Sequence, residues 1–362
     1  MKANDRTLIV ALAAMLLPAL TACQHDKLIE REQSTPTALQ VPLQLTSGIL
    51  STVTRAYDSS WETGDEIGVF TVKAGSTNTA DITRSGTYED ANICYKLSDN
   101  AGETYYPSTS SYDYQTFTSV DKVTIGAQEE DKKIYLPIDG SDVDVYAYYP
   151  YDSEATASAK TITLETDQTL AGQKGYDLLS ACALSSTSAI NLDYANVQLL
   201  FRHELSKVLI KVVAGEGYNS SDLFENIRVE LTGQPTQALF SPLTRELSIT
   251  TGSNTIVPMK LSSGDADYSK IGSASCIFRA LVLPNMTETN PAVSSGQRQI
   301  RFYVGAEPNI ATYKYNISQT FTAGQETTFT LRLAATGITI TAAISAWDTE
   351  SIDDDQPIYE TN

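Results

Sequence analysis

The chain has 362 residues, of which 44 are acidic and 25 basic, and its formal net charge is -19 at pH 7. An acidic surface of this kind repels phosphate groups, which argues against nucleic-acid binding and against electrostatic docking onto anionic lipid. The length accommodates two domains of ordinary size. The four cysteines and two histidines match no zinc or redox spacing, so we predict no cofactor and no metal site.

Residues 1–22 have the layout of a secretion signal. Lys2 and Arg6 form a basic start, and Leu8 to Leu17 is an unbroken apolar run. The run is about half of the ~20 residues that a membrane-spanning helix needs. We therefore predict a signal peptide that is removed.

The four residues that end the signal, Leu20 to Cys23, resemble the lipobox of bacterial lipoproteins. The resemblance implies that the thiol of Cys23 receives a diacylglycerol, that the signal is cut in front of it, and that the new amino terminus is acylated. Two or more acyl chains hold a protein stably on a membrane. The alternative is an ordinary signal peptide with an incidental cysteine near the cut.

The next segment, residues 23–42, mixes charges with a Ser-Thr-Pro-Thr run and is predicted to be a lipidated, solvated tether. Short runs of alternating apolar and polar residues then begin, separated by turn-forming residues. The strands expected in the first half lie at residues 43–53, 67–72, 134–137 and 143–149.

A second series of expected strands follows a break near Asp177, at residues 197–203, 205–212, 227–231, 328–333 and 338–341. We find no helical periodicity of ten or more residues. Many short strands with turns between them predict an all-β fold with two β-sandwiches in tandem. We place the domains at residues 43–190 and 191–350, with an acidic polar tail at 351–362.

Candidate catalytic residues are few. His25 lies in the tether and His203 in a strand-like run, without a Gly-x-Ser-x-Gly elbow, so His203 is predicted to be a packed sheet residue. A catalytic pair of carboxylates, as found in glycosidases, stays an open alternative, because such a pair is defined by the distance between its two carboxyl groups and a sequence does not show that distance. Tyrosines are concentrated in the first half, between Tyr105 and Tyr151, where their rings could stack on sugars or pack on a half-buried sheet.

Three cysteines remain after Cys23, namely Cys94, Cys182 and Cys276. One pair could oxidise in an exported protein, and three buried thiols are the equal alternative.

Six segments are spread over nearly all of the chain after the signal. They are Thr54–Ala56, Trp61–Phe70, Val143–Tyr151, Phe201–Val208, Phe278–Pro284 and Ile344–Trp347. Together, and in this order, they resemble the fimbrillin family of Gram-negative gut and oral anaerobes.

This resemblance implies a subunit of a type V pilus, made as a lipoprotein and carried to the outer membrane and cell surface. It also implies two sandwich domains of transthyretin-like topology. In the family, a trypsin-like, arginine-specific protease removes an amino-terminal segment that includes the first strand, and a strand of the next subunit fills the groove. Arg55 best matches the cleaved position, which makes Ala56 the new amino terminus. Arg31 is the competing site, and cutting there would keep the strand.

The expected function is therefore a structural or adhesive pilus subunit that is not an enzyme. Its partners would be other pilin subunits, the protease, the membrane through the lipid on Cys23, and host or bacterial glycans or proteins. The candidate donor strand is Ile338–Trp347, and stalk, anchor and tip roles stay open. The alternatives are a monomeric surface lipoprotein that binds glycans and a sandwich-fold glycoside hydrolase.

Overall fold

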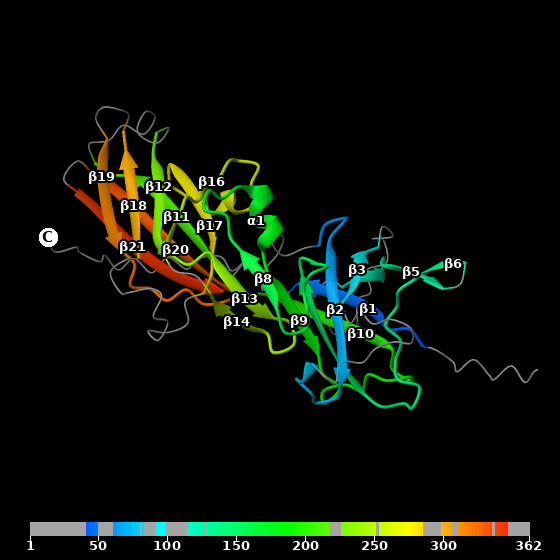
Figure 1. Ribbon diagram of the computed structural model, residues 1–362. Coiled ribbons are helices and arrows are strands. Elements are labelled where there is room, and N and C mark those ends of the chain that lie inside the picture. The colour runs from blue at the N-terminus through cyan, green and yellow to red at the C-terminus, as the bar shows by residue number, and fades with distance from the viewer. Residues whose placement is uncertain are drawn as a thin grey trace, which may run out of the picture. The chain divides into compact units, whose positions relative to one another are not determined.

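The structure is a computed structural model of the chain. It describes residues 41–49, 61–79, 82, 92–98, 114–125, 127–216, 226–250, 253–284, 298–305, 310–334 and 337–346. These residues belong to one unit that begins at Val41. Their regular structure is almost entirely β-strand, which confirms the predicted all-β class (Figure 1).

The first half forms a seven-stranded sheet that closes on itself, because its last strand pairs back with its first. All neighbouring strands run antiparallel except β1 and β10, which run parallel. In place of two separate layers, these residues enclose their core within one continuous sheet. In spatial order the strands are β1 (Gln44–Ile49), β10 (Asn196–His203), β9 (Leu179–Ala183), β7 (Val143–Tyr149), β2 (Glu66–Lys73), β3 (Ile93–Leu97) and β4 (Gln115–Ser119).

Burial follows the period of two where one face of a strand is solvated. In β10, Val197, Leu199 and Phe201 face the core and are at most 4% exposed. The alternation is lost in β7, where Val145 faces the core of the closed sheet and Tyr148 packs into a second apolar cluster on the other face. A strand covered on both faces reads as a continuous apolar run.

The second half is a sandwich of two sheets that share one core. One sheet contains, in order, β16 (Met259–Lys260), β17 (Cys276–Val282), β11 (Ser206–Ala214), β20 (Gln325–Ala334) and β21 (Gly337–Ala346). The other contains β15 (Asn254–Ile256), β12 (Arg228–Gln234), β18 (Gln299–Val304) and β19 (Ala311–Asn316). Among the described strands β21 is therefore an edge strand, paired with β20 alone along its ten residues.

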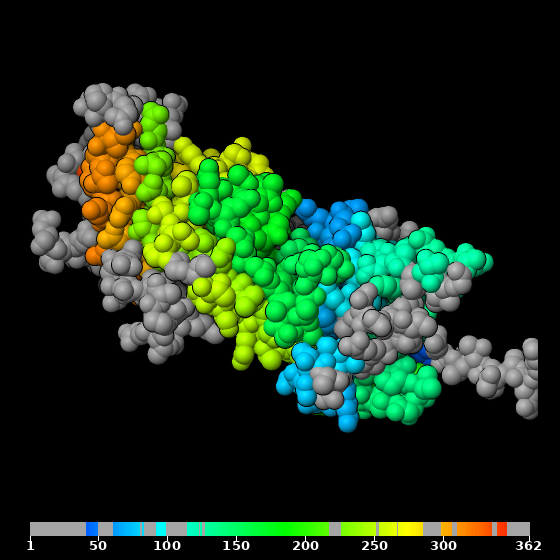
Figure 2. All heavy atoms as spheres, in the orientation of Figure 1, coloured from blue at the N-terminus to red at the C-terminus, as the bar shows by residue number. Residues whose placement is uncertain are grey.

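Smaller elements complete the described part. β5 (Lys122–Ile125) and β6 (Gln128–Asp131) form a hairpin, and β8 (Lys160–Thr163), β13 (Gln237–Ser241) and β14 (Glu246–Ile249) form a three-stranded sheet. The helices described are a short α-helix, α1 (Leu170–Tyr176), and a 3₁₀ helix, η3 (Ala266–Ile271). The side chains of α1 (green) and of β13 and β14 (yellow-green) reach the surface on the face shown in Figure 2.

Two secondary-structure elements differ from what the sequence predicted. Residues 134–137 form no strand, since Tyr135 makes only an isolated bridge with Pro42. The helix α1 was not expected, because its seven residues include Gly172 and Gly175 and show no apolar period, although Thr169 caps its start by accepting from the Gly172 amide.

The strand pairing places the change from the first sheet to the second between β10 and β11, at Glu204 and Leu205. This is later than the expected boundary at residue 190. Both strands are alternating apolar runs separated by two residues, so their sequences alone do not show that they enter different sheets.

Candidate functional site

β1 lies between two strands of the closed sheet and is hydrogen-bonded to both. It pairs with β10 along its whole length, Gln44–Ile49, and with β4 at three positions. The backbone ahead of it is also held, because the Leu43 amide donates to the Ile134 carbonyl at 2.8 Å. Without β1, the facing edges of β10 and β4 would be unpaired, and a single extended strand could fill that groove.

Alternate residues point into the core, beginning with Leu43, just ahead of β1, and continuing through the strand. Leu43, Leu45, Ser47 and Ile49 are 4%, 1%, 0% and 8% exposed, whereas Gln44 on the opposite face is exposed. Burying each large apolar side chain contributes about 1.5–3 kcal/mol. β1 is therefore part of the core of the closed sheet and not a loosely attached edge.

Trp61 is the first residue described after β1, and it closes one end of this groove. Its indole meets three rings edge-on, at centroid distances of 5.2 Å to Phe117, 5.5 Å to Tyr149 and 5.1 Å to Phe201. Phe117 belongs to β4 and Phe201 to β10, so Trp61 bridges the two strands that flank β1. The sequence singled out Trp61 as part of a family-like segment but gave no signal of this contact.

The turn that follows Trp61 is held by Asp65. Its carboxylate accepts from the Glu62 amide at 2.7 Å and from the Tyr149 hydroxyl at 3.1 Å. Gly64 has φ of 102°, a conformation that favours glycine. All of these contacts are made outside β1, so the turn keeps them if β1 leaves.

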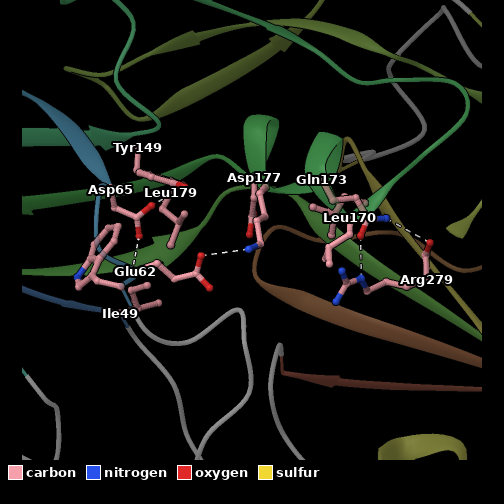
Figure 3. Close-up of a pocket in the computed structure, with 12 residues that line it drawn as sticks. Ile49, Glu62, Asp65, Tyr149, Leu170, Gln173, Asp177, Leu179 and Arg279 are labelled. Carbon is pink, nitrogen blue, oxygen red and sulfur yellow. Dashed lines mark hydrogen bonds and ion pairs between the residues drawn. The ribbon is translucent and has the colours of Figure 1, made fainter. Parts of the chain in front are cut away.

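A small pocket of about 70 Å³ lies beside this turn, next to the end of β1 at Ile49. Figure 3 shows Glu62 and Asp65 on one side of it, and Gln173 and Arg279 on the other. Burial raises the pKa of Asp65, against the lowering effect of its hydrogen bonds. Small-molecule sites measure roughly 300–1,000 Å³, so this space admits water but no substrate.

A larger hollow of about 1040 Å³ lies over the amino-terminal half of β1. It is lined by parts of β1, β4, β9 and β10 and by the segment after β9. Among the described residues that line it, none is charged, and half carry an amide or a hydroxyl group, as Gln44, Asn196 and Gln198 do. The hollow can therefore offer neutral hydrogen-bonding groups to a ligand.

The family-like segment Phe201–Val208 supplies buried polar groups where β10 ends. His203 is 3% exposed, and its Nδ1 lies 3.0 Å from a carboxylate oxygen of Asp177, which confirms the prediction that His203 is a packed sheet residue. Glu204, also buried, accepts from the Ser180 hydroxyl and from Arg202 Nε at 2.9 Å. These contacts fix the end of β10 to β9 and to the residue after α1.

Lys207 anchors a buried ionic cluster on β11. Its Nζ lies 3.4 Å from Asp267 and 3.3 Å from Glu326, and all three side chains are 0% exposed. Lys270 and Arg279 add further pairs, with Lys270 at 2.7 Å from Glu326 and Arg279 at 3.1 Å from Asp267. Burial alone would raise the pKa of Asp267, but the surrounding cations hold it below its ordinary value. Sequence reasoning missed this cluster, because its members are far apart in the chain.

The predicted processing and lipidation residues, Cys23, Arg55 and Ala56, lie outside the residues that the structure describes. The other three cysteines are described and free. Cys94 and Cys276 are buried, and burial raises the pKa of Cys94 to about 12 and that of Cys276 to about 11.

Among the described tyrosines between Tyr105 and Tyr151, Tyr114, Tyr146 and Tyr148 are buried, whereas Tyr135, Tyr149 and Tyr151 are half-buried. Tyr146 and Tyr148 are 6% and 0% exposed, and the Tyr148 hydroxyl donates to the Asp152 carbonyl at 2.9 Å. Their ring faces are therefore not available for stacking on a sugar. Tyr105, Tyr106 and Tyr112 are outside the described residues.

No group of three or more His, Cys, Asp or Glu side chains among the described residues is arranged to hold a metal ion. In the same part of the chain, no helix has the length and apolar character needed to span a membrane.

Comparison with known proteins places this arrangement in a family. Residues 54–347 match the model of the fimbrillin-like family. A Bacteroides uniformis protein described as a candidate fimbrium subunit, Fim1C, is 26% identical over 351 residues, which is 95% of this chain and 95% of that protein.

Solved structures show the same fold. The structure of a candidate cell adhesion protein from Bacteroides uniformis covers 86% of this chain and 99% of its own, with a TM-score of 0.59 and 22% identity. One from Bacteroides ovatus covers the same shares with a TM-score of 0.56 and 19% identity. Because the family model spans most of the sequence, the chain belongs to the fimbrillin-like family.

Proposed function

We propose that this chain is a fimbrial subunit of the cell surface, exported as a lipoprotein and polymerised by exchange of its first strand. The observation that carries the proposal is the position of β1. It fills a groove with both edges paired, and it ends at Ile49, a few residues ahead of Arg55. The match to a candidate fimbrium subunit over nearly the whole chain supports the same role.

In this proposal, an arginine-specific protease cuts after Arg55 and releases the lipid on Cys23 together with β1. The cleaved subunit then presents the edges of β10 and β4 and an apolar slot. An added strand satisfies the backbone groups and the slot together, which makes a long-lived joint. Cutting at Arg31 instead would free the lipid and keep β1 in place.

The donor is the carboxy-terminal strand of a second copy or of a related subunit. β21 suits this role because it lies at the edge of its sheet, where β20 is its single neighbour within the described part of the chain. If β21 leaves the sheet, it therefore loses its hydrogen bonds to that one strand. We propose no catalytic step for this chain.

The test is the amino terminus of filaments sheared from cells, compared between the wild-type chain and the variant Arg55→Lys. The variant keeps the positive charge but removes the arginine that the protease requires. We expect Ala56 as the wild-type terminus, and loss of both Ala56 and filaments in Arg55→Lys. The matched variant Arg31→Lys should still assemble. Acylated Cys23 as the only terminus in wild-type filaments contradicts the proposal.

The lipid step is tested separately. Cys23→Ser should abolish incorporation of labelled palmitate and release the precursor from the outer membrane fraction. Unchanged labelling would exclude Cys23 as the lipid site.

A second candidate function, glycan binding, rests on the hollow over β1. Neutral amide and hydroxyl groups suit neutral sugars, which are bound by hydrogen bonds to their hydroxyls. A glycan array probed with the full chain tests this. We expect weakened binding in Gln198→Ala, with the exposed variant Asp193→Ala as a control, and binding that is equal in both variants would exclude this hollow.

A further inference from the structure

β1 contains an unfavourable feature at its centre, a buried hydroxyl group without a hydrogen-bond partner among the residues that the structure describes. Ser47 is 0% exposed and points into the core between Leu45 and Ile49. Within the described part of the chain, its hydroxyl has no hydrogen-bond partner. A buried hydroxyl without a partner has given up its hydrogen bonds to water and gained none in return, which destabilises the state that contains it.

The neighbouring strand β4 contributes a second buried polar group without a partner in the described part of the protein. Gln115 of β4 lies directly opposite Ser47, and its Oε1 is also buried without a partner among the described residues. β1 and β4 are paired at only three positions, against six between β1 and β10. The seam between β1 and β4 is thus the weaker side of the groove.

β21 has the same order of large and small side chains as the inward face of β1, but it has no hydroxyl at the position that matches Ser47. The inward positions from Leu43, just ahead of β1, to Ile49 carry a large, a large, a small and a large side chain in steps of two residues. The same steps in β21 also read large, large, small, large, but the small residue is apolar. The matching positions are Leu43 and Ile338, Leu45 and Ile340, Ser47 and Ala342, and Ile49 and Ile344.

One large apolar side chain of β21 is poorly buried in the sheet to which the strand belongs. Ile344 is 51% exposed there, whereas Ile49, at the matching position of β1, is 8% exposed. β21 is also rich in β-branched residues, while β1 contains Gly48. Glycine weakens a strand and β-branched residues favour one.

We propose that the buried Ser47 makes β1 easier to displace, and that β21 of a second copy replaces it between β10 and β4. In the proposed register, Ala342 of β21 occupies the position that Ser47 leaves. The incoming strand runs parallel to β10, as β1 does, because only in that direction do all four inward positions of β21 match the side-chain sizes of the positions they replace. Exchange removes the unpaired hydroxyl and buries Ile344, and both changes favour the joined state. This inference rests on the strand exchange proposed above.

The first test measures the release of β1. In the full chain, residues 52–57 are replaced by a recognition sequence for a site-specific protease, the folded protein is cut, and loss of the labelled amino-terminal piece is followed over time. Ser47→Ala keeps the size of the side chain close and removes the hydroxyl, so we expect release to slow roughly tenfold.

Ser206→Ala is the matched control for this test. Ser206 is also 0% exposed, but its hydroxyl donates to the Gln325 carbonyl at 3.1 Å, and it lies in β11 outside the groove. This variant should not slow release. Equal release from Ser47→Ala and wild type, or equal slowing by Ser206→Ala, overturns the role of Ser47.

The second test measures the register. A labelled peptide of residues 337–346 is added to the cut chain, and its affinity is compared with that of two variants carrying the same change at neighbouring positions. Ala342→Ser restores a buried hydroxyl and should bind roughly tenfold more weakly. Ala343→Ser faces outward in this register and should bind like the original peptide. If the Ala343→Ser peptide binds more weakly than the Ala342→Ser peptide, the proposed register is wrong.

These outcomes separate the inference from the function on which it rests. A peptide of residues 41–49, the native occupant, serves as the reference. If the cut wild-type chain neither releases β1 nor takes up either peptide, strand exchange itself fails. If exchange occurs but the two serine variants do not differ as stated, only the register and the role of Ser47 fail.

Discussion

Trp61 lies edge-on against Phe201, with ring centroids 5.1 Å apart and ring planes at 89°. Phe201 is the residue of β10 that pairs with Ile49, the last residue of β1. Trp61 therefore stands where β1 ends, on the side of the chain that remains if the protein is cut at Arg55. We expect it to keep β4 and β10 in position when β1 is absent.

Trp61→Ala should destabilise the full chain by about 3–5 kcal/mol, because it removes a large buried side chain and three ring contacts. Urea unfolding measures the free energy, and Trp61→Phe should lose less. Tyr194→Ala, at a ring that is 62% exposed, is the control and should stay within about 0.5 kcal/mol of wild type. A loss of similar size in both alanine variants would contradict this role.

Lys207→Met should destabilise the protein by about 3–5 kcal/mol, because it leaves Asp267 and Glu326 buried without the cation between them. The matched variant is Lys211→Met on the same strand, where the side chain is only half-buried. That change should shift the free energy of unfolding by less than about 0.5 kcal/mol. Equal effects at the two lysines would show that the buried cluster contributes little.

Stability should fall in acid through Asp267. Its pKa in the folded protein lies below the ordinary value of 3.8, so the folded state favours the carboxylate. Its contribution is fully present above about pH 5 and is lost as the pH falls through the folded pKa.

Unfolding midpoints measured from pH 7 down to pH 2 test this point. The difference between wild type and Asp267→Asn should be largest near pH 7 and should shrink towards pH 2. Asp193→Asn, an exposed site, should follow wild type throughout. A difference that stays constant with pH would exclude the titration of Asp267 as its source.

Thiol labelling of the native protein should reach Cys182 first. Cys94 and Cys276 are 2% and 5% exposed with raised pKa values, whereas Cys182 is half-buried, with Arg245 Nη1 3.1 Å from its sulfur. Mass spectrometry at pH 8 should find Cys94 and Cys276 unlabelled until denaturant is added. Rapid native labelling of Cys94 would show that the closed sheet opens locally.

Much of the fold followed from local periodicity. The alternation at residues 197–203 and 328–333, and the run of β-forming residues at 143–149, predicted strands that the structure confirms. The short helix α1 did not follow, because two glycines and seven residues carry no helical pattern. The hairpin of β5 and β6 did not follow either, since the segment Gln128–Asp131 is polar and exposed.

The candidate site was only half predictable. An apolar strand ahead of Arg55 was expected from its alternation and from the family resemblance. Its partners were not, because β10 lies far along the chain and any alternating strand could have paired there. The unpaired hydroxyl of Ser47 was equally hidden, since nothing in the local sequence distinguishes a serine on a solvated face from a serine buried without a partner.

The sequence by itself determined the all-β class and the faces of the main strands. These properties depend on residues that are neighbours in the chain, so a local pattern records them. Only the tertiary structure decided that β1 lies between β10 and β4, that Trp61 bridges those strands, and that Lys207 meets Asp267 and Glu326. Those contacts depend on which distant segments pair, and strand pairing is selected by the packing of the whole sheet rather than by the pattern of any one strand.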